Sequence, residues 1–483
     1  MSRTEPPPDH EQARRAKLTS LLAAGDQPYK FGFERTHTLG DLVAKYGDVE
    51  PGSDTGDEVR VAGRIRTIRR HGLLMFADLQ DSSGKVQLFV DAARLESRFE
   101  DFGDLDIGDW AGVWGTVITT KRGELSVRID GFDILSKCLH PLPEKWHGLK
   151  DIELRTRQRY VDLITNPRSM EILLARSRAV VSIRNWLADR DFIEVETPML
   201  HPIPGGATAR PFVTFHETLG MNLYLRIAPE LYLKRLIVGG VEKVFEINRS
   251  FRNEGVSNQH NPEFTMLELY QAFADYFTMA DLLEGIVRAA AMAVRGSLKF
   301  DYQGRELDLE SPFRRVRLVD LVREHGFDPE VESEALMQIY EKKIEPEIFQ
   351  PTFVMDFPRE VTPLARMHRS EEGFTENLDL VIAGMEVGPA YSELIDPIDQ
   401  RARFAEQLAQ REAGDTEAQV IDEDFLLALE YGMPPTGGLG FGIDRMVRIL
   451  ADVPSIREVI LFPVLRPEKP APEKPAPEKP ANG

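Results

Sequence analysis

A polar loop between two predicted strands at 243–273 concentrates residues that could bind a charged ligand. The loop contains Arg252, Glu254 and His260. Side chains alternate along a strand, so every second residue of the strand that follows lies on one face. That face would carry an aromatic ring, a carboxylate and a phenol, which together make a poor core: Phe264, Met266, Glu268 and Tyr270. The alternative is a half-buried strand face in contact with solvent.

Two carboxylates flank a turn that is predicted within 378–397. Asp379 and Glu386 stand on either side of Ala383-Gly384, so their side chains could converge across a hairpin. Carboxylate oxygens on a rigid turn suit Mg²⁺ that is shared with a polyphosphate. Paired surface acids are the alternative. Gly388-Pro389 should then interrupt the strand pairing and redirect the polar side chains that follow, Tyr391 and Glu393.

A third segment, 434–450, is rich in glycine. Its glycines allow close backbone approach, and the helix predicted after them carries Arg445 in its first turn. Arginine there can present a planar, permanently charged fork to a phosphate; a surface arginine is the alternative. Together the three segments supply what bound ATP needs: two arginines, two carboxylates and an aromatic plane. A second set suits a ligand ammonium: Glu268, Tyr270 and Glu393.

The surrounding elements predict an α+β protein with two domains. Residues 58–136 show five short strands, with a helical segment from Ala92 to Phe99 between the third and the fourth. That pattern is typical of a five-stranded OB-fold barrel. Residues 169–465 mix long helices with strands that look antiparallel, and contain no GxGxxG or Walker loop. They predict a catalytic domain whose antiparallel sheet is flanked by helices.

Three further segments extend or connect these domains. Residues 1–57 are predicted as a helical extension, with one helix from Glu11 to Ala24 after a triproline at 6–8. Residues 137–168 are predicted as a linker. Residues 466–483 repeat PEKPA and predict a disordered tail, because they offer no apolar side chains that could pack.

The large domain is expected to begin with a helix over 169–190. Its buried stripe would comprise Leu173, Val180, Ile183 and Leu187, which follow helical spacing. The helix runs into FIEVETP, which alternates like a strand and stops at Pro198.

Composition excludes several classes of protein. The net charge of −20 argues against a general nucleic-acid binder, although a local basic surface is compatible with it. Cys138 is the only cysteine, so no intrachain disulfide or cysteine-rich zinc site can form. No stretch approaches the roughly 18–20 apolar residues that span a bilayer, and the first residues lack the apolar core of a signal peptide. We therefore expect a cytoplasmic protein without membrane or disulfide partners.

The sequence resembles the class II aminoacyl-tRNA synthetases. Their three motifs correspond to the helix and strand that end at Pro198, to FRNE with HNPEFT, and to GLGFGIDR. Within that class it is similar to the lysine–tRNA ligases, through HPLPEKWHGL, RQRYVDL, PIPGGATARPF, YLRIAPELYLKRLIVGG and NPEFTMLELYQAFADY. The aspartate and asparagine ligases share the architecture but differ where GGATARPF and MLELY stand here.

The resemblance implies a ligase that uses ATP and Mg²⁺ to join L-lysine to tRNA(Lys) through a lysyl-adenylate. Arg252 would bridge the α-phosphate and the lysine carboxylate, and Arg445 would pair with the γ-phosphate and stack on adenine. Further ATP-binding residues would be Glu254, His260, Asn261 and Phe264, with Mg²⁺ held by Asp379 and Glu386. The lysine pocket would comprise Gly206, Glu230, Glu268, Tyr270 and Glu393.

In the barrel, the resemblance implies anticodon contacts at Phe76, Gln87 and Glu124. Stacking a base that is turned out on an aromatic ring is the usual strategy of such folds. A run of arginines could add local positive charge, or could simply be solvated: Arg64, Arg66, Arg69 and Arg70. The resemblance also implies a homodimer formed through the segment that ends at Pro198.

Two departures from the family pattern and two rival functions complete the expectations. Pro389 stands where typical members carry an asparagine that contacts the substrate carboxylate, and it offers neither a side-chain donor nor an N–H. The segment 328–350 is also shorter than in longer members.

The two rival functions are a paralogue that supplies lysyl-tRNA to a non-translational pathway, and a tRNA-binding regulator without catalysis. The joint presence of both arginines and both metal-type carboxylates opposes the second.

Overall fold

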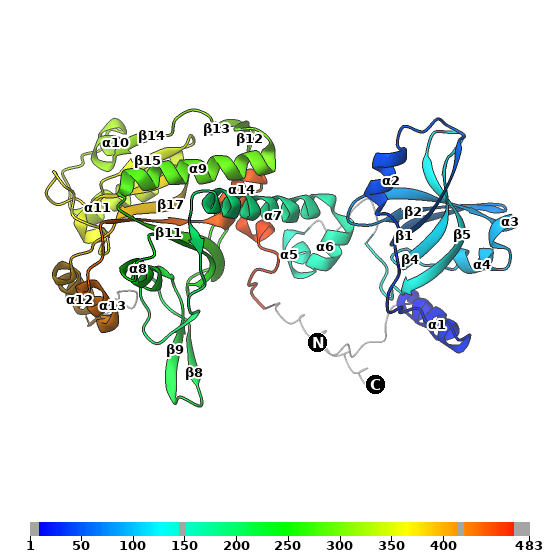
Figure 1. Ribbon diagram of the computed structural model, residues 1–483, viewed down its shortest axis with the longest axis horizontal. Coiled ribbons are helices and arrows are strands. Elements are labelled where there is room, and N and C mark those ends of the chain that lie inside the picture. Colours follow the sequence, from blue (N-terminus) through cyan, green and yellow to red (C-terminus); the bar gives the residue numbers. More distant parts are fainter. Residues whose placement is uncertain (1–8, 144–150, 413–419, 468–483) are drawn as a thin grey trace, which may run out of the picture. The chain divides into compact units, whose positions relative to one another are not determined.

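The computed structural model describes residues 9–143, 151–412 and 420–467. The chain forms two compact units, residues 1–148 and 149–483 (Figure 1). Three predictions fall wholly or partly outside the described residues. They concern the triproline at 6–8, positions 144–150 of the predicted linker, and the PEKPA tail from 468 onward.

Five strands close into a barrel in the N-terminal unit, in the order β1-β2-β3-β5-β4. Two short helices stand between the third and fourth strands, so the predicted OB-type barrel with its helical insertion is confirmed. The elements are α1 (Asp9–Ala23), α2 (Leu39–Tyr46), β1 (Asp54–His71), β2 (Leu74–Gln80), β3 (Lys85–Asp91), α3 (Ala92–Leu95), α4 (Arg98–Gly103), β4 (Trp110–Thr119) and β5 (Leu125–Ser136).

Side chains along the barrel strands alternate between the apolar core and the outer face, so the outward-facing side chains are available to ligands. In β2 the side chains of Met75, Ala77 and Leu79 are fully buried in the barrel core. Phe76 lies between them in sequence and therefore faces the other side of the strand. Gln87 alternates in the same way with the buried residues of β3.

An eight-stranded sheet forms the centre of the C-terminal unit, in the order β14-β15-β16-β17-β18-β11-β10-β6. All pairings from β15 to β10 are antiparallel, as predicted, and only the outermost pair at each edge is parallel. The strands are β6 (Ile193–Glu194), β10 (Lys243–Phe251), β11 (Glu263–Ala272), β14 (Arg314–Arg317), β15 (Thr352–Met355), β16 (Asn377–Ile382), β17 (Met385–Ser392) and β18 (Thr436–Phe441).

The helices of this unit cover both faces of the sheet (Figure 1). They are α5 (Ile152–Arg157), α6 (Arg159–Thr165), α7 (Pro167–Ala188), α8 (Glu230–Val238), α9 (Tyr276–Arg295), α10 (Leu318–Glu324), α11 (Ser333–Ile339), α12 (Pro397–Glu412), α13 (Glu423–Glu430), α14 (Ile443–Leu450) and α15 (Ile456–Val459). Single turns occur at Tyr340–Ile344, Glu345–Glu347 and Arg359–Val361. The helical part of the predicted linker forms α5 and α6.

The two faces of β11 have different surroundings. Leu267 and Leu269 are buried in the large apolar cluster that includes α7 and α9. Glu268 and Tyr270 therefore point to the opposite face, where α8 and α13 pack. One face of the sheet thus provides the core, and the other is available for chemistry.

The predicted strand over FIEVETP is wrong in extent. Only β6 pairs as a strand, and it runs parallel to β10. Further along, the Thr197 amide and hydroxyl donate to Glu246 Oε2 at 3.2 and 2.6 Å, so a side chain replaces the backbone ladder. Proline has no N–H with which to extend the pairing at Pro198.

The predicted stripe of α7 is partly wrong. Ile183 and Leu187 are buried, whereas Leu173 and Val180 are only half-buried. The buried positions also include small residues, Ala175 and Ala179. Small side chains allow α7 to lie close to α9, and Ser182 Oγ donates to Ala289 O at 2.9 Å across that contact. Sequence spacing favours bulky apolar residues and overlooks alanines that pack because they are small.

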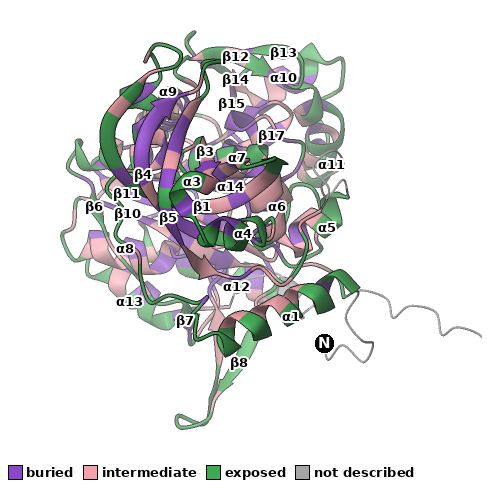
Figure 2. Cartoon of the chain, turned by 90° about the vertical axis from the view of Figure 1, so that its right-hand side faces the viewer, coloured by how far each residue is buried: buried purple, intermediate pink, exposed green. Residues whose placement is uncertain are grey.

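Two smaller sheets complete the unit. One is a hairpin of β12 (Lys299–Tyr302) and β13 (Arg305–Asp308). The other joins β7 (Leu200–His201), β8 (Val213–His216) and β9 (Met221–Leu225) in the order β7-β9-β8. The β8–β9 hairpin projects from the unit, and β8 is largely exposed (Figure 2). Its exposed side chains include Val213 and Phe215.

Candidate active site

Two adjoining cavities lie against the face of β11 that carries Met266 and Glu268. One has a volume of about 150 Å³ and lies toward α14, and the other has a volume of about 210 Å³ and lies toward α8. Four residues line both cavities: Arg252, Met266, Pro389 and Gly440. A molecule in one cavity would therefore touch a molecule in the other at these residues.

The smaller cavity contains every residue that was predicted to bind the nucleotide. Arg252, Glu254, His260, Asn261, Phe264 and Arg445 all line it. The Arg252 guanidinium lies 5.2 Å from the Phe264 ring centroid. Arg252 Nε and Asn261 Oδ1 are buried and have no hydrogen-bond partner in the described part of the chain. Buried polar atoms without partners are costly, so these two atoms indicate a polar ligand.

Arg445 lines the same cavity, and two contacts hold its guanidinium. Its Nη1 donates to Glu386 O at 2.6 Å, and its Nη2 lies 3.4 Å from His260 Nε2. Burial, followed by the positive charge of Arg445, lowers the pKa of His260. A neutral imidazole beside two arginines suits an anionic ligand that the guanidinium groups neutralise.

Asp444 aligns the helix of Arg445 with β11. One of its carboxylate oxygens pairs with Arg176 of α7, and the other accepts a hydrogen bond from Thr265 N at 2.8 Å. Arg176 Nη2 also donates to Thr265 Oγ1 at 2.9 Å. The orientation of Arg445 therefore depends on contacts among α7, β11 and α14, which are distant in sequence.

The hairpin of β16 and β17 supplies the two predicted metal-type carboxylates. Ala383 and Gly384 both have positive φ, 54° and 71°, so the predicted two-residue turn is confirmed. Burial, followed by the charges of Glu386 and then Glu345, raises the pKa of Asp379 well above its usual value. Glu386 lines the smaller cavity, whereas Asp379 does not. A divalent cation bound by both carboxylates would relieve their repulsion, and carboxylate oxygens are suitable ligands for Mg²⁺. In residues 9–143, 151–412 and 420–467, no cluster of three or more candidate ligands occurs.

The predicted break at Gly388-Pro389 is wrong. β17 continues through both residues, with Gly388 opposite Leu380 and Pro389 opposite Asp379. The irregularity lies one step earlier, as a register shift between Leu380 and Val381. The shift leaves Val387 without an opposite residue, two positions before Pro389, and the strand continues past the proline.

The larger cavity brings together four of the five residues that were predicted for the amino acid. Gly206, Glu230, Glu268 and Tyr270 line it. Gly206 has φ +88°, and a Cβ there would lie 3.0 Å from Glu230 Cβ, so the close approach requires glycine. Tyr270 donates to Glu268 Oε2 at 3.3 Å. Burial, followed by the charge of Glu230, raises the pKa of Glu268 well above its usual value.

Glu393 is the fifth residue, and it lines a different cavity, together with Ser392 and Thr436. Its side chain is buried, and Oε2 is 2.5 Å from Lys234 Nζ. A Cβ at position 438 would collide with Glu393 Oε1 and with the Tyr270 ring, so glycine at 438 gives both side chains their room. Sequence analysis missed Lys234, although its spacing from Glu230 is the i,i+4 spacing of a helical ion pair.

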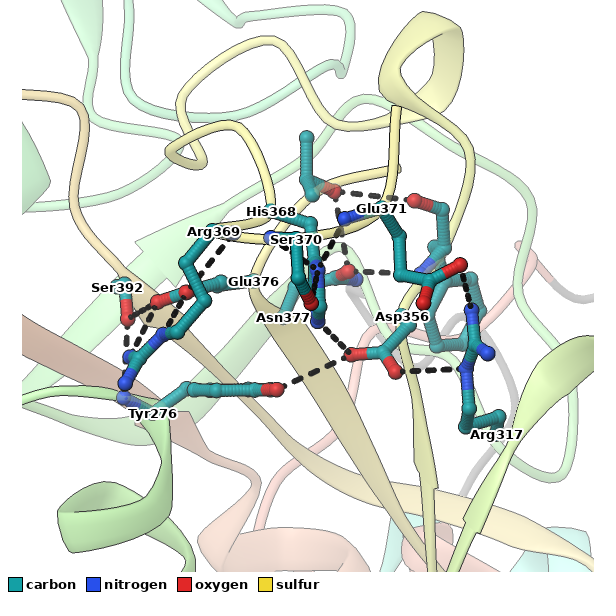
Figure 3. A network of polar contacts seen from close by, with 12 residues as sticks. Tyr276, Arg317, Asp356, His368, Arg369, Ser370, Glu371, Glu376, Asn377 and Ser392 are labelled. Atoms are coloured by element: carbon teal, nitrogen blue, oxygen red, sulfur yellow. Dashed lines mark hydrogen bonds and ion pairs between the residues drawn. The ribbon is translucent and has the colours of Figure 1, made fainter. Parts of the chain in front are cut away.

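A polar network fixes the backbone just before Glu393 (Figure 3). Ser392 Oγ donates to Glu376 Oε2 at 2.6 Å and accepts from Tyr276 N at 3.1 Å. Glu376 is itself held by Arg369, whose Nη2 lies 2.9 Å from Oε2. Ser392 is therefore held by two elements, and it anchors the backbone that carries Glu393.

In the barrel, the three predicted contact residues line one cavity of about 800 Å³. Phe76 packs edge-to-face on Phe89, with 5.4 Å between ring centroids, and Ser126 Oγ donates to Gln87 Oε1 at 3.1 Å. Glu124 comes from the loop between β4 and β5. The cavity thus combines an aromatic face with hydrogen-bonding groups, which suits a nucleobase.

The predicted arginine cluster does not form as one patch. Of its members only Arg69 lines the barrel cavity. Arg64 lies 4.8 Å from the Trp110 ring centroid, and Arg70 pairs with Glu100 at 2.7 Å. Arg66 is half-buried. Alternation along β1 places the adjacent Arg69 and Arg70 on opposite faces. Besides Arg69, the cavity takes positive charge from three residues that were not predicted: Lys121, Arg122 and Arg128.

Comparison with known proteins yields matches over most of the chain. Residues 151–466 match the family described as tRNA synthetases class II (D, K and N), and residues 59–135 match the OB-fold nucleic acid binding domain. The lysine–tRNA ligase of Moorella thermoacetica is 49% identical over 484 residues, covering 94% of this chain and 97% of that protein. The lysine–tRNA ligases of Syntrophomonas wolfei and Nostoc punctiforme are 48% and 49% identical, and cover 95% of this chain and 97% and 88% of their own.

Among the helices of the described ranges, none is both long enough and apolar enough to cross a bilayer.

Proposed function

This chain belongs to the class II tRNA synthetases, and within them to the lysine–tRNA ligases, so we propose that its two cavities bind ATP and lysine side by side. In this proposal the smaller cavity takes ATP and the larger takes L-lysine. The N-terminal barrel takes the anticodon of tRNA(Lys).

The first step joins lysine to the nucleotide. A carboxylate oxygen of lysine attacks the α-phosphorus of ATP, the bond to the β-phosphate breaks, and pyrophosphate leaves. The terminal ribose hydroxyl of tRNA then displaces AMP from the lysyl-adenylate. The carboxylate is already a nucleophile, so the protein needs to align the reactants and neutralise charge at the α-phosphate.

The observation that carries this proposal is that Arg252 lines both cavities. Its buried Nε has no partner among the described residues, and its guanidinium can bridge a phosphate and a carboxylate. Arg445, on the opposite side of the ATP cavity, suits the outer phosphates. Pro389 also lines both cavities, so the position where the family carries asparagine faces the reacting groups without offering a donor.

Selectivity for lysine follows from the buried carboxylates. Glu230 and Glu268 would accept hydrogen bonds from ammonium groups, while Tyr270 holds Glu268 in place. An uncharged isostere leaves a buried carboxylate without a partner, and discrimination of this kind reaches roughly 10⁴-fold.

Asp379 and Glu386 would hold Mg²⁺, which when bound neutralises phosphate charge. Replacing Asp379 with asparagine removes one anionic ligand, so we expect the Mg²⁺ concentration for half-maximal activity to rise by about tenfold or more. Pyrophosphate exchange measured across a Mg²⁺ titration checks this. Asp320→Asn, an exposed residue on α10, is the control. An unchanged Mg²⁺ dependence in D379N would argue against the metal assignment.

Phe76 would stack on an anticodon base in the barrel. Phe76→Ala is expected to raise the KM for tRNA by about ten- to a hundredfold, because stacking contributes ~1–3 kcal/mol per base. Amino-acid activation without tRNA should stay within about twofold, since the reaction takes place in the other unit. Phe31→Ala, a fully exposed ring outside the cavity, is the matched control. Equal effects of the two variants would contradict the anticodon role.

The test of the function itself is lysine-dependent ATP–pyrophosphate exchange with a panel of amino acids. Exchange with lysine alone supports the proposal. No exchange with any amino acid, in folded protein with Mg²⁺, would instead favour a tRNA-binding regulator.

Assembly and location are also proposals. A homodimer would cover exposed apolar side chains near the segment that ends at Pro198, among them Ile193, Met199 and Leu200. Sedimentation at several concentrations tests this. A cytoplasmic location follows from a role in charging tRNA.

A further inference from the structure

Lys234 is a fully buried lysine beside the amino-acid cavity. Its side chain has no exposed area, and Nζ lies 2.6 Å from Glu230 Oε1 and 2.5 Å from Glu393 Oε2. The two carboxylates come from different elements, since Glu230 begins α8 and Glu393 follows β17. A single ammonium therefore connects two residues that were assigned to the substrate.

Each carboxylate uses only one oxygen for this contact. Within the described residues, Glu230 Oε2 and Glu393 Oε1 accept no hydrogen bond from the protein. Glu268 adds a third carboxylate, and its partner is the neutral hydroxyl of Tyr270. Three carboxylates and the Lys234 ammonium leave two negative charges, which match the two ammonium groups of a lysine molecule, while the Arg252 guanidinium in the same cavity matches its carboxylate.

Other charges near α8 are already neutralised. On the side of α13, Arg235 pairs with Asp422 at 2.9 Å. On β10, Glu246 pairs with Arg226 at 2.6 Å. The groups that face Lys234 itself are Glu230, Glu393 and the Tyr270 ring, whose centroid lies 5.8 Å from Nζ. Arg252 also lines the cavity, and Lys234 is the cation that contacts both Glu230 and Glu393.

We propose that Lys234 is a positioning residue that sets the charge of the amino-acid cavity, by keeping Glu230 and Glu393 ionised and oriented so that the cavity matches the two ammonium groups of lysine. This inference rests on the proposed function. It adds a residue that touches neither ATP nor the reacting atoms and acts through the two carboxylates.

The directions in which the pKa values of Lys234 and Glu393 are shifted support this role. Burial alone would lower the pKa of Lys234, but the carboxylates, Glu230 foremost, raise it above its usual value, so the ammonium persists at neutral pH. Burial raises the pKa of Glu393 to about 7 even though Lys234 opposes the shift. Without Lys234 the Glu393 carboxyl would remain protonated to higher pH, and lysine could bind only by displacing that proton.

The test is calorimetric titration of L-lysine into the full-length protein at pH 8, in two buffers of different ionisation enthalpy. Lys234→Met is expected to weaken lysine binding about 100-fold, and to release about one proton more than the wild type on binding. The KM for lysine in pyrophosphate exchange should rise in parallel, while the KM for ATP stays within about threefold. If K234M does not fold, as judged by circular dichroism, K234Q replaces it.

Arg235→Met is the matched control, because it removes the neighbouring cation on α8 that pairs with Asp422 away from the cavity. Its lysine affinity and proton release should equal those of the wild type. A folded K234M that keeps wild-type affinity, or that binds weakly without the additional proton release, overturns the inference and leaves Lys234 a structural ion pair. Failure of the wild type itself to bind lysine overturns the proposed function, and this inference with it.

Discussion

Replacing Arg252 with glutamine is expected to reduce lysine-dependent ATP–pyrophosphate exchange by about 10³-fold or more in kcat/KM, the largest effect of any single change in the chain. Arg252 is the one charged residue that lines both cavities. Glutamine keeps some hydrogen-bonding capacity but removes the positive charge at the point where the α-phosphate and the lysine carboxylate must meet. Because that charge acts mainly in the transition state, kcat should fall together with kcat/KM.

Arg249→Gln is the matched control for this experiment. Arg249 lies on β10, outside both cavities, where it faces Glu263 at 3.7 Å. Exchange by R249Q should stay within about twofold of the wild type, because exposed ion pairs contribute little to stability. An R252Q variant that loses less than about tenfold would show that the two cavities do not meet in the reaction, and the assignment of the site would have to be revised.

The second large effect is expected at Glu268. Glu268→Gln should lower kcat/KM for lysine by about 10³-fold, with the KM for ATP nearly unchanged. The carboxylate is buried and would pair with a substrate ammonium, which a neutral amide cannot replace. Glu263→Gln, an accessible residue on the same strand, makes the same chemical change outside the cavities and should leave exchange unaffected.

The same residue predicts the pH dependence of lysine binding. Burial raises the pKa of Glu268, so its neutral form persists to higher pH than that of an ordinary glutamate. Lysine needs the ionised form, hence its KM should fall as the pH rises through that raised pKa. The KM for lysine measured from pH 6 to 9 tests this direction. A wild-type KM that is flat over this range, or a slope that persists in E268Q, would contradict the assignment.

Much of the site could be predicted because it depends on local periodicity. Alternation along 263–272 places Glu268 and Tyr270 on one face of the strand whatever the strand packs against. The turn at Ala383-Gly384 is likewise a local matter, since it needs two residues that tolerate positive φ. The six ATP-binding positions belong to two sequence segments, 243–273 and 434–450, and all of them line one cavity.

Predictions failed where the outcome depended on a neighbour that sequence spacing does not reveal. The sequence left open whether the arginine run in β1 gathers positive charge or is solvated, and the structure gives its members separate partners, with only Arg69 at the barrel cavity. Gly388-Pro389 was expected to interrupt the strand pairing, but β17 stays paired with β16 through both residues. The stripe of α7 was misjudged because Ile172, Ala175 and Ala179 are buried, whereas Leu173 and Val180 are only half-buried.

The sequence by itself determined the elements, the faces of the strands and the kinds of chemical group on each face, because these follow from backbone periodicity and side-chain type. Only the tertiary structure decided that Arg252 stands where two cavities meet, and that Glu393 reaches the amino-acid site through Lys234. Those relations join strands and helices that are far apart in the chain. Their geometry is set by how the sheet and the helices pack. The free energy of a buried charge depends on the partner that this packing places beside it.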